Sequence, residues 1–259
     1  MIEEPYRWVE AIANRREYIE TQLASGSPIV ALSYQDGILF LTFGRSRQKI
    51  FEIYDRIAMG AIGHPGDIER LRMAAIELAS TEGFTRSAAD VSLRRLAHYS
   101  LSPVMKAAFE QVYGAPFLAR LLFAEVGPAP AEDLFLRVEY DGAIATNGAG
   151  PSPTRHDFAV LSATKDSAGL MERFLTQEYR PTAELSEAIN AAMDAWAVGH
   201  MATGETGVKD LPERAAIAKR RDERLAQSGL EAAVLERSGK SAIRYRTLSK
   251  DEMNSLGKG

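Results

Sequence analysis

Side chains that could do chemistry are few in this sequence and lie far apart. The four histidines stand at His64, His98, His156 and His200. None is spaced as H-x-x-x-H or H-E-x-x-H, the patterns that put two ligands on one face of a helix, so no metal site is expected. The absence of cysteine excludes disulfides, zinc–cysteine sites and thiol catalysis. These residue types therefore predict neither a metal nor a cofactor.

One short motif has the spacing of a catalytic serine–lysine pair. The segment 46–49, Ser-Arg-Gln-Lys, matches S-x-x-K, but the S-D-N and K-T-G motifs that accompany it in acylating enzymes are absent. A four-residue match arises often by chance, and there is no G-x-S-x-G motif. Gly204 and Gly207 lie near Lys209, but their spacing does not fit a phosphate-binding loop. The residues alone do not predict an active site.

Three cations, Arg45, Arg47 and Lys49, stand close enough together to contact phosphate. No aromatic residue alternates with them, and the 259-residue chain has 31 Lys+Arg against 35 Asp+Glu, a formal net charge of -4. Nucleic acid and anionic membranes are therefore not expected partners. The apolar runs are shorter than the roughly 20 residues that span a bilayer, and Met1 to Glu20 carries charges throughout, so a cytoplasmic protein without a secretory signal is expected.

The elements that must hold these residues can be read from hydrophobic period and turn residues. Helices are predicted at 5–24, 68–83, 87–112, 166–178, 183–199 and 211–227, and strands at 29–34, 38–43, 50–54, 57–62, 117–125, 134–140, 143–145, 157–162, 230–236 and 242–248.

Four local features carry explicit expectations. Gly37 should turn the first hairpin because glycine tolerates positive φ, and Gly83 should cap the second helix. Pro103 should kink the third helix or restart it with Ser102 as N-cap. The highly charged segment 211–227 should stand off the core, and 249–259 should be a short helix or a loose tail.

The order of elements contains no βαβ alternation, which disfavours a parallel sheet. Antiparallel hairpins and paired helices instead predict an α+β fold, a four-layer αββα sandwich of two antiparallel sheets flanked by helices. The expected organisation is one domain over 1–248, with a first segment and helix at 1–24 and a charged helical insert at 200–228, followed by a tail at 249–259.

Seven stretches spread along the chain form a familiar series. The early ones read IVALSY at 29–34, DGILF at 36–40, QKIFEIYDRI at 48–57 and AIG at 61–63, and the later ones YGAPF at 113–117, RVEYDG at 137–142 and LEAAVL at 230–235. These stretches resemble the 20S proteasome subunits of the Ntn-hydrolase-like superfamily, with the closest resemblance to α-type subunits of the bacterial, actinobacterial style. Their order over residues 5–248 carries the resemblance, which implies the same αββα fold.

The resemblance implies a subunit without its own catalytic site. In catalytic β-type subunits an N-terminal threonine is the nucleophile, assisted by an acidic residue and a lysine. The matching positions here are Ser27, Phe43 and Lys49, so only the lysine remains. Two alternatives stay open: a self-processing amidohydrolase or peptidase with Ser27 as nucleophile, and a stand-alone ring scaffold.

The resemblance also implies sites and partners. Lys49, with backbone near Gly63, would line a pocket between neighbouring subunits that accepts the C-terminal tail of an activator. A gate segment is implied at Met1, Ile2, Glu3, Glu4, Pro5 and Tyr6, and a pore loop at Tyr113, Gly114, Ala115, Pro116 and Phe117. The implied partners are six further copies in a heptameric ring, proteasome β-type subunits, a ring-shaped regulatory ATPase and protein substrates in transit.

Overall fold

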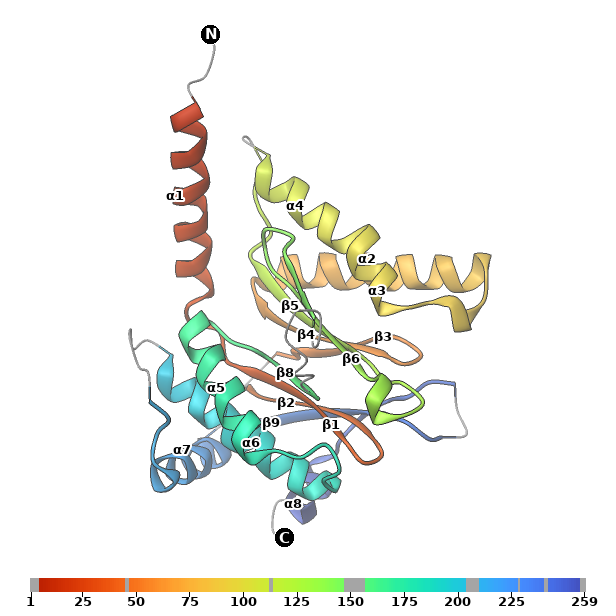
Figure 1. The fold of residues 1–259 in the computed structure, drawn as a ribbon, viewed down its shortest axis with the longest axis vertical. Coiled ribbons are helices and arrows are strands. Elements are labelled where there is room, and N and C mark those ends of the chain that lie inside the picture. Colours follow the sequence, from red (N-terminus) through yellow and green to blue (C-terminus); the bar gives the residue numbers. More distant parts are fainter. Residues whose placement is uncertain are drawn as a thin grey trace.

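Two antiparallel sheets, each of five strands, lie face to face at the centre of the computed structural model (Figure 1). The structure describes residues 5–44, 47–111, 114–146, 157–203, 210–227, 229–239 and 242–256. The first sheet has the order β10-β9-β2-β1-β8, with β1 at Ile29–Tyr34, β2 at Gly37–Gly44, β8 at Phe158–Leu161, β9 at Gly229–Glu236 and β10 at Tyr245–Thr247. The second has the order β3-β4-β5-β6-β7, with β3 at Ile50–Tyr54, β4 at Ile57–Gly63, β5 at Ala119–Glu125, β6 at Leu134–Val138 and β7 at Ile144–Thr146.

Helices cover the outer face of each sheet and complete the four layers. The first sheet is covered by α5 (Lys165–Glu178) and α6 (Leu185–Ala202), with α7 (Arg214–Gln227) beside α6 and α8 (Lys250–Leu256) near the end of the chain. The second is covered by α2 (Pro65–Thr85), α3 (Leu93–Leu96), a π-helical turn at Ala97–Leu101 and α4 (Ser102–Glu110). Short 3-10 turns stand at Ala88–Asp90 and Pro130–Glu132. The predicted α+β sandwich is confirmed.

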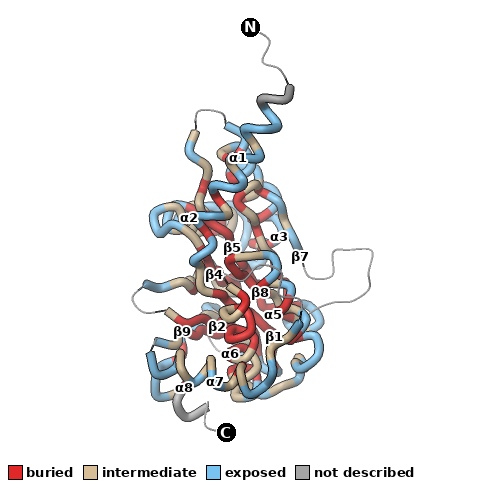
Figure 2. The backbone as a smooth tube through the Cα atoms, turned by 90° about the vertical axis from the view of Figure 1, so that its left-hand side faces the viewer, coloured by how far each residue is buried: buried red, intermediate tan, exposed pale blue. Residues whose placement is uncertain are grey.

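Three apolar clusters hold the layers together. The inter-sheet cluster includes the fully buried Ile29, Phe40, Leu122 and Phe135, and further clusters lie between each sheet and its helices. Strands buried on both faces read as continuous apolar runs rather than alternating ones, which is why β1 and β2 were recognisable from composition. Figure 2 shows this buried centre and the exposed outer surfaces of the helices.

Two glycines have roles other than the predicted ones. The β1–β2 hairpin is present, but Gly37 has no positive φ; a Cβ there would lie 2.0 Å from the Leu235 carbonyl oxygen on the neighbouring β9. Gly83 lies inside α2 rather than at its end, and a Cβ there would lie 2.1 Å from the Tyr54 hydroxyl oxygen. Both positions therefore require glycine because of close packing.

The predicted helix over 87–112 is broken differently from expectation. Ser92 caps its true start, with its hydroxyl accepting from Arg95 N at 3.4 Å, and the π-helical turn runs directly into α4. Ser102 is not an N-cap, because it has helical backbone angles and its hydroxyl donates to the Gly142 carbonyl at 2.6 Å. The wider π turn accommodates Pro103, which lacks an N–H and crowds the preceding turn of an α-helix.

The charge of α7 predicted that this helix would stand off the core, and the structure shows that it packs against the core instead. Ile217 is buried in the cluster beneath α6, and Arg221 forms an ion pair with Asp194 of α6 at 2.9 Å. The Ile217 side chain and the Arg221–Asp194 ion pair hold α7 against α6, although the composition of this helix is otherwise that of a solvated surface. The tail also packs, since Met253 of α8 is buried in the same cluster.

The first helix, α1 (Pro5–Leu23), rises away from the sandwich and is anchored along its C-terminal half (Figure 1). Ile19 and Leu23 are buried against Phe109 and Tyr140. The nearly buried Arg120 guanidinium binds the Glu20 carboxylate and so links α1 to the second sheet. The outer part of α1 exposes apolar side chains, with Val9 66% exposed, and this leaves a free helix face.

Candidate functional site

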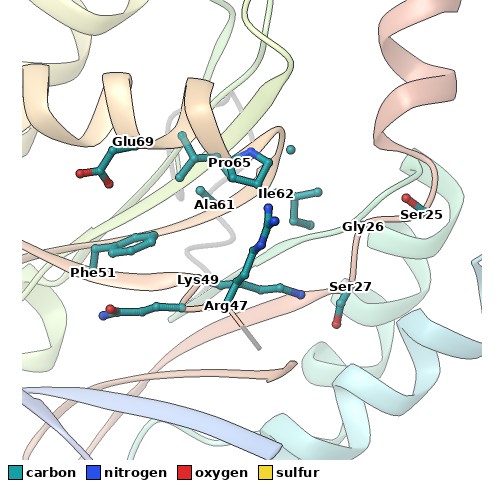
Figure 3. Close-up of a pocket in the computed structure, with 13 residues that line it drawn as sticks. Ser25, Gly26, Ser27, Arg47, Lys49, Phe51, Ala61, Ile62, Pro65 and Glu69 are labelled. Carbon is teal, nitrogen blue, oxygen red and sulfur yellow. The ribbon is translucent and has the colours of Figure 1, made fainter. Parts of the chain in front are cut away.

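A cavity of about 420 Å³ opens where the loop after α1, the start of β3 and the start of α2 meet (Figure 3). Lys49 and Gly63, which the resemblance assigned to one activator-binding pocket, both line this cavity. Its apolar wall is formed by Phe51, Ile62 and Ile68. The two sheets and α2 therefore bring together a cation, a strand end and an apolar surface.

The backbone of Lys49 is held from both sheets. Its carbonyl accepts from Ala61 N on β4 at 3.1 Å, while its N–H donates to the Glu231 carboxylate of β9 at 2.9 Å. Glu231 also accepts from Ile50 N at 2.9 Å. Sequence reasoning missed Glu231; the signal was a carboxylate inside the apolar run of a central strand, where an acid needs a specific partner.

The Lys49 ammonium has no carboxylate partner among the described residues. The Glu231 carboxylate binds main-chain N–H groups rather than the Lys49 ammonium. Burial lowers the pKa of Lys49, and the nearby charge of Glu231 offsets only part of that lowering. In Figure 3 the Lys49 side chain extends toward Ser27, with Arg47 beside it. A half-buried cation of this kind is suited to an anionic group that enters the cavity.

Gly63 is fixed by the contact between β4 and β5. Its φ is +144°, and a Cβ would lie 2.0 Å from the Leu118 carbonyl oxygen. The neighbouring N–H of His64 donates to that same oxygen at 2.7 Å. The His64 N–H is thus engaged within the fold, and the part that the backbone near Gly63 plays in closing the cavity stays a prediction.

Ser27 lies at the edge of the cavity but lacks the surroundings of a nucleophile. Its hydroxyl donates to the Phe43 carbonyl at 2.9 Å and accepts from Trp196 Nε1 at 3.2 Å. Its nitrogen belongs to a peptide bond with Gly26, so it cannot act as the free amine that serves as base in N-terminal nucleophile catalysis. Phe43 is buried where an acidic residue would be needed. This geometry does not assist attack by the hydroxyl.

The other predicted site residues lie away from the cavity. Pro5 and Tyr6 begin α1, and the loop of Gly114, Ala115, Pro116 and Phe117 connects α4 to β5. Arg15 of α1 donates to the Phe109 and Gln111 carbonyls at 2.5 and 2.8 Å, which brings the end of α4 against α1. Met1, Ile2, Glu3, Glu4 and Tyr113 lie outside the described residues.

Two features are absent from the described part of the chain. No group of three or more histidine or acidic side chains there could hold a metal ion. No helix there is both long and apolar enough to cross a bilayer.

Comparison with known proteins gives consistent relatives. No family model matches the chain. It is 30% identical over 243 residues to a proteasome subunit alpha of Kineococcus radiotolerans, covering 88% of this chain and 86% of the relative. It is 28% identical to that of a Nocardioides species, covering 95% and 86%, and 30% identical to that of Thermobifida fusca, covering 88% and 80%. With this similarity along nearly its whole length and the αββα sandwich it adopts, the chain belongs to the proteasome α-subunit family.

Proposed function

We propose that this chain forms the outer, heptameric α-ring of a bacterial 20S proteasome, where it gates substrate entry and docks a ring-shaped regulatory ATPase. As an α-type subunit it is not an enzyme, and proteasome β-type subunits of the same particle would cleave the protein substrates that pass through. The particle would work in the cytoplasm. The family membership supports assembly with other proteasome subunits, and the Lys49 cavity and helix α1 support the docking and gating roles.

The observation that carries the docking role is the unpaired Lys49 ammonium at the cavity wall. A chain terminus offers one carboxylate and, one residue further in, an apolar side chain. The cavity offers the complementary pair, a half-buried cation and the apolar surface of Phe51, Ile62 and Ile68. An ammonium has three donors and no acceptor, so a terminal carboxylate satisfies it without leaving a polar atom unpaired.

The gating role is argued from α1. Its base is fixed to the sandwich by Ile19, Leu23 and the Arg120–Glu20 ion pair, whereas its outer part is exposed. A 19-residue helix is about 28 Å long, so Pro5 and Tyr6, which begin α1, lie about that far from its base. In a ring, the segments of all copies that begin with Met1 would converge near the entrance. The end of α4, which leads to the loop 114–117, contacts α1 through Arg15.

The docking proposal is tested on the assembled α/β particle with a short fluorescent peptide that ends in an apolar residue and a free carboxylate. Lys49→Ala should weaken peptide binding by about ten- to a hundredfold, since a hydrogen bond between charged partners is worth about 1.5–3 kcal/mol. Lys49→Arg should restore only part of the affinity, because a planar guanidinium does not reproduce a compact ammonium.

Two controls separate docking from general charge effects. Lys219→Ala removes an exposed lysine of α7 and should leave binding unchanged. The same peptide with an amidated C-terminus should bind the parent particle as weakly as the carboxylate peptide binds Lys49→Ala. Equal binding of the carboxylate peptide by the parent and Lys49→Ala would show that the tail docks elsewhere.

A further inference from the structure

A second cavity, of about 290 Å³, lies behind Ser27 and shares Lys49 with the docking cavity. Its other lining side chains include Phe43, Trp196, His200 and Arg224. Helix α6 supplies the two aromatic rings Trp196 and His200, and α7 supplies Arg224. Nothing in the docking role of Lys49 uses this compartment.

Two cations face this compartment without a matching acid. Among the described residues that line it, Lys49 and Arg224 are positively charged and none is acidic. Arg224 forms no ion pair with a described carboxylate. It forms a hydrogen bond with the His200 ring and a cation–π contact with Trp196 at 6.0 Å. Arg221, one turn earlier on α7, is by contrast paired with Asp194 at 2.9 Å.

His200 is held as a neutral ring with a defined position of its proton. It stacks on Trp196 with ring centroids 4.7 Å apart, and burial together with Arg224 and Arg220 lowers its pKa to about 4, so it is neutral at pH 7. A guanidinium only donates, so Nε2 of His200 must accept from Arg224 and the ring proton must sit on Nδ1. That Nδ1 is buried and has no hydrogen-bond partner among the described residues.

The acids in the neighbourhood are engaged elsewhere or point to other surfaces. Glu231 binds the Lys49 and Ile50 N–H groups and does not line the compartment. Asp194 and Asp222 both bind Arg221. Glu223 lies 3.7 Å from Arg220. None of them forms a direct ion pair with Lys49 or Arg224, although the charge of Glu231 raises the pKa of Lys49 in part.

We propose that this compartment binds a small oxyanion, a carboxylate or phosphate group, between the Lys49 ammonium and the Arg224 guanidinium above the Trp196 and His200 rings. A guanidinium presents a planar fork of donors that matches two oxygens of either group, and an ammonium that lines the same compartment can supply a third contact. The bound anion would draw on the same ammonium that the proposed docking role assigns to an activator tail. An anion bound in this compartment would therefore weaken binding of an activator tail. This competition rests on the proposed docking role, whereas binding of the anion does not.

The chain offers its own reporter for a direct test. It has two tryptophans, and Trp8 is on the free face of α1, so Trp8→Phe leaves Trp196 as the single fluorophore. Inorganic phosphate and acetate are titrated separately into the full chain at constant ionic strength made up with chloride. Saturable changes in Trp196 emission are expected, and the ratio of the two affinities tells which oxyanion the compartment prefers. Isothermal titration calorimetry on the parent gives an independent affinity.

The variants decide where the anion sits. Arg224→Gln should weaken binding by about ten- to a hundredfold, Arg224→Lys should retain part of it, and Lys219→Gln on the same helix should leave it unchanged. Arg224→Gln should also leave tail-peptide binding intact in the absence of phosphate, so a failed anion site and a failed docking site give different results. Calorimetry on each variant shows whether an altered signal reflects binding rather than a changed fluorescence baseline. A thermal melt of each variant shows whether it is folded.

Three results would overturn the proposal. The first is an absence of saturable binding of either anion to the parent. The second is an unchanged affinity in Arg224→Gln with the fold intact. The third is loss of binding in Lys49→Gln while Arg224→Gln binds normally, which would place the anion in the docking cavity instead.

Discussion

The buried ion pair between Asp133 and Arg237 joins the two sheets, and replacing Asp133 by Asn should destabilise the whole sandwich. Asp133 lies at the start of β6, with its side chain fully buried, and it accepts from Arg237 Nη1 and Nη2 at 2.7 and 2.9 Å. It also accepts from the Ser33 hydroxyl on β1 at 2.7 Å and from Gly127 N at 2.9 Å. One carboxylate thus holds the first sheet, the second sheet and the segment after β9.

The size of the effect follows from this burial. The amide of Asn has one acceptor oxygen and an NH₂ group that would face donors, so Arg237 would be left as a largely buried, poorly paired cation. Breaking a buried pair in this way costs about 3–5 kcal/mol. At about 2–4 °C per kcal/mol for a domain near this size, the melting temperature should fall by roughly 6–20 °C.

The assay is thermal unfolding followed by circular dichroism at fixed protein concentration, because assembly also shifts apparent stability. The exposed pair of Lys106 and Glu110, 3.8 Å apart, provides the control; Glu110→Gln should change stability by no more than about 0.5 kcal/mol. The double variant Asp133→Asn/Arg237→Met should recover part of the loss, since no unpaired charge is left. A melt of Asp133→Asn that matches the Glu110→Gln control would refute the reasoning.

Three further variants test the site and its supports. Glu231→Ala should weaken tail-peptide binding about fivefold, because it removes the hydrogen bonds that hold the backbone at Lys49. Removing a negative charge near Lys49 would by itself favour an anionic tail. Tighter binding in this variant would therefore contradict a positioning role for Glu231. Gly83→Ala should cost about 1–3 kcal/mol in a urea melt by crowding the Tyr54 hydroxyl, and Tyr54→Phe in the same chain should recover part of that loss; an additive double variant would argue against the contact. Because the pKa of His200 is lowered to about 4 in the folded state, the unfolded chain binds the proton first as the pH falls. Between about pH 6.5 and pH 4 the melting temperature of the parent should therefore fall more than that of His200→Gln. Parallel pH profiles of the two proteins would count against a buried neutral ring.

Most of the layer order could be predicted from the sequence because each central strand is a short apolar run between clear turn residues. The runs at 29–34 and 50–54 coincide with β1 and β3. Where prediction was wrong, a tertiary contact had replaced a local rule. Gly83 has the sequence context of a cap, but its reason is Tyr54, a residue almost thirty positions away in the chain. In the same way, the high charge of α7 predicted an exposed helix, whereas the buried side chain of Ile217 packs this helix against the core.

The docking cavity was only partly predictable. Lys49 and Gly63 came from resemblance, and the structure places both on one cavity wall. The position of Glu231 inside an apolar strand indicates that this acid needs a partner. Local sequence does not identify the partner, because that depends on β9 lying against the start of β3. Arg224 and Trp196 are separated from Lys49 by well over a hundred residues, and only the packing of α6 and α7 brings them to the same compartment.

The claim that this chain forms a docking ring is tested most directly by electron cryomicroscopy of the α/β particle with a saturating carboxylate tail peptide. The account predicts seven copies of the chain in each outer ring, with the peptide carboxylate within hydrogen-bond distance, about 2.7–3.2 Å, of Lys49 Nζ. A ring of another size, or a peptide terminus bound away from Lys49, would contradict it.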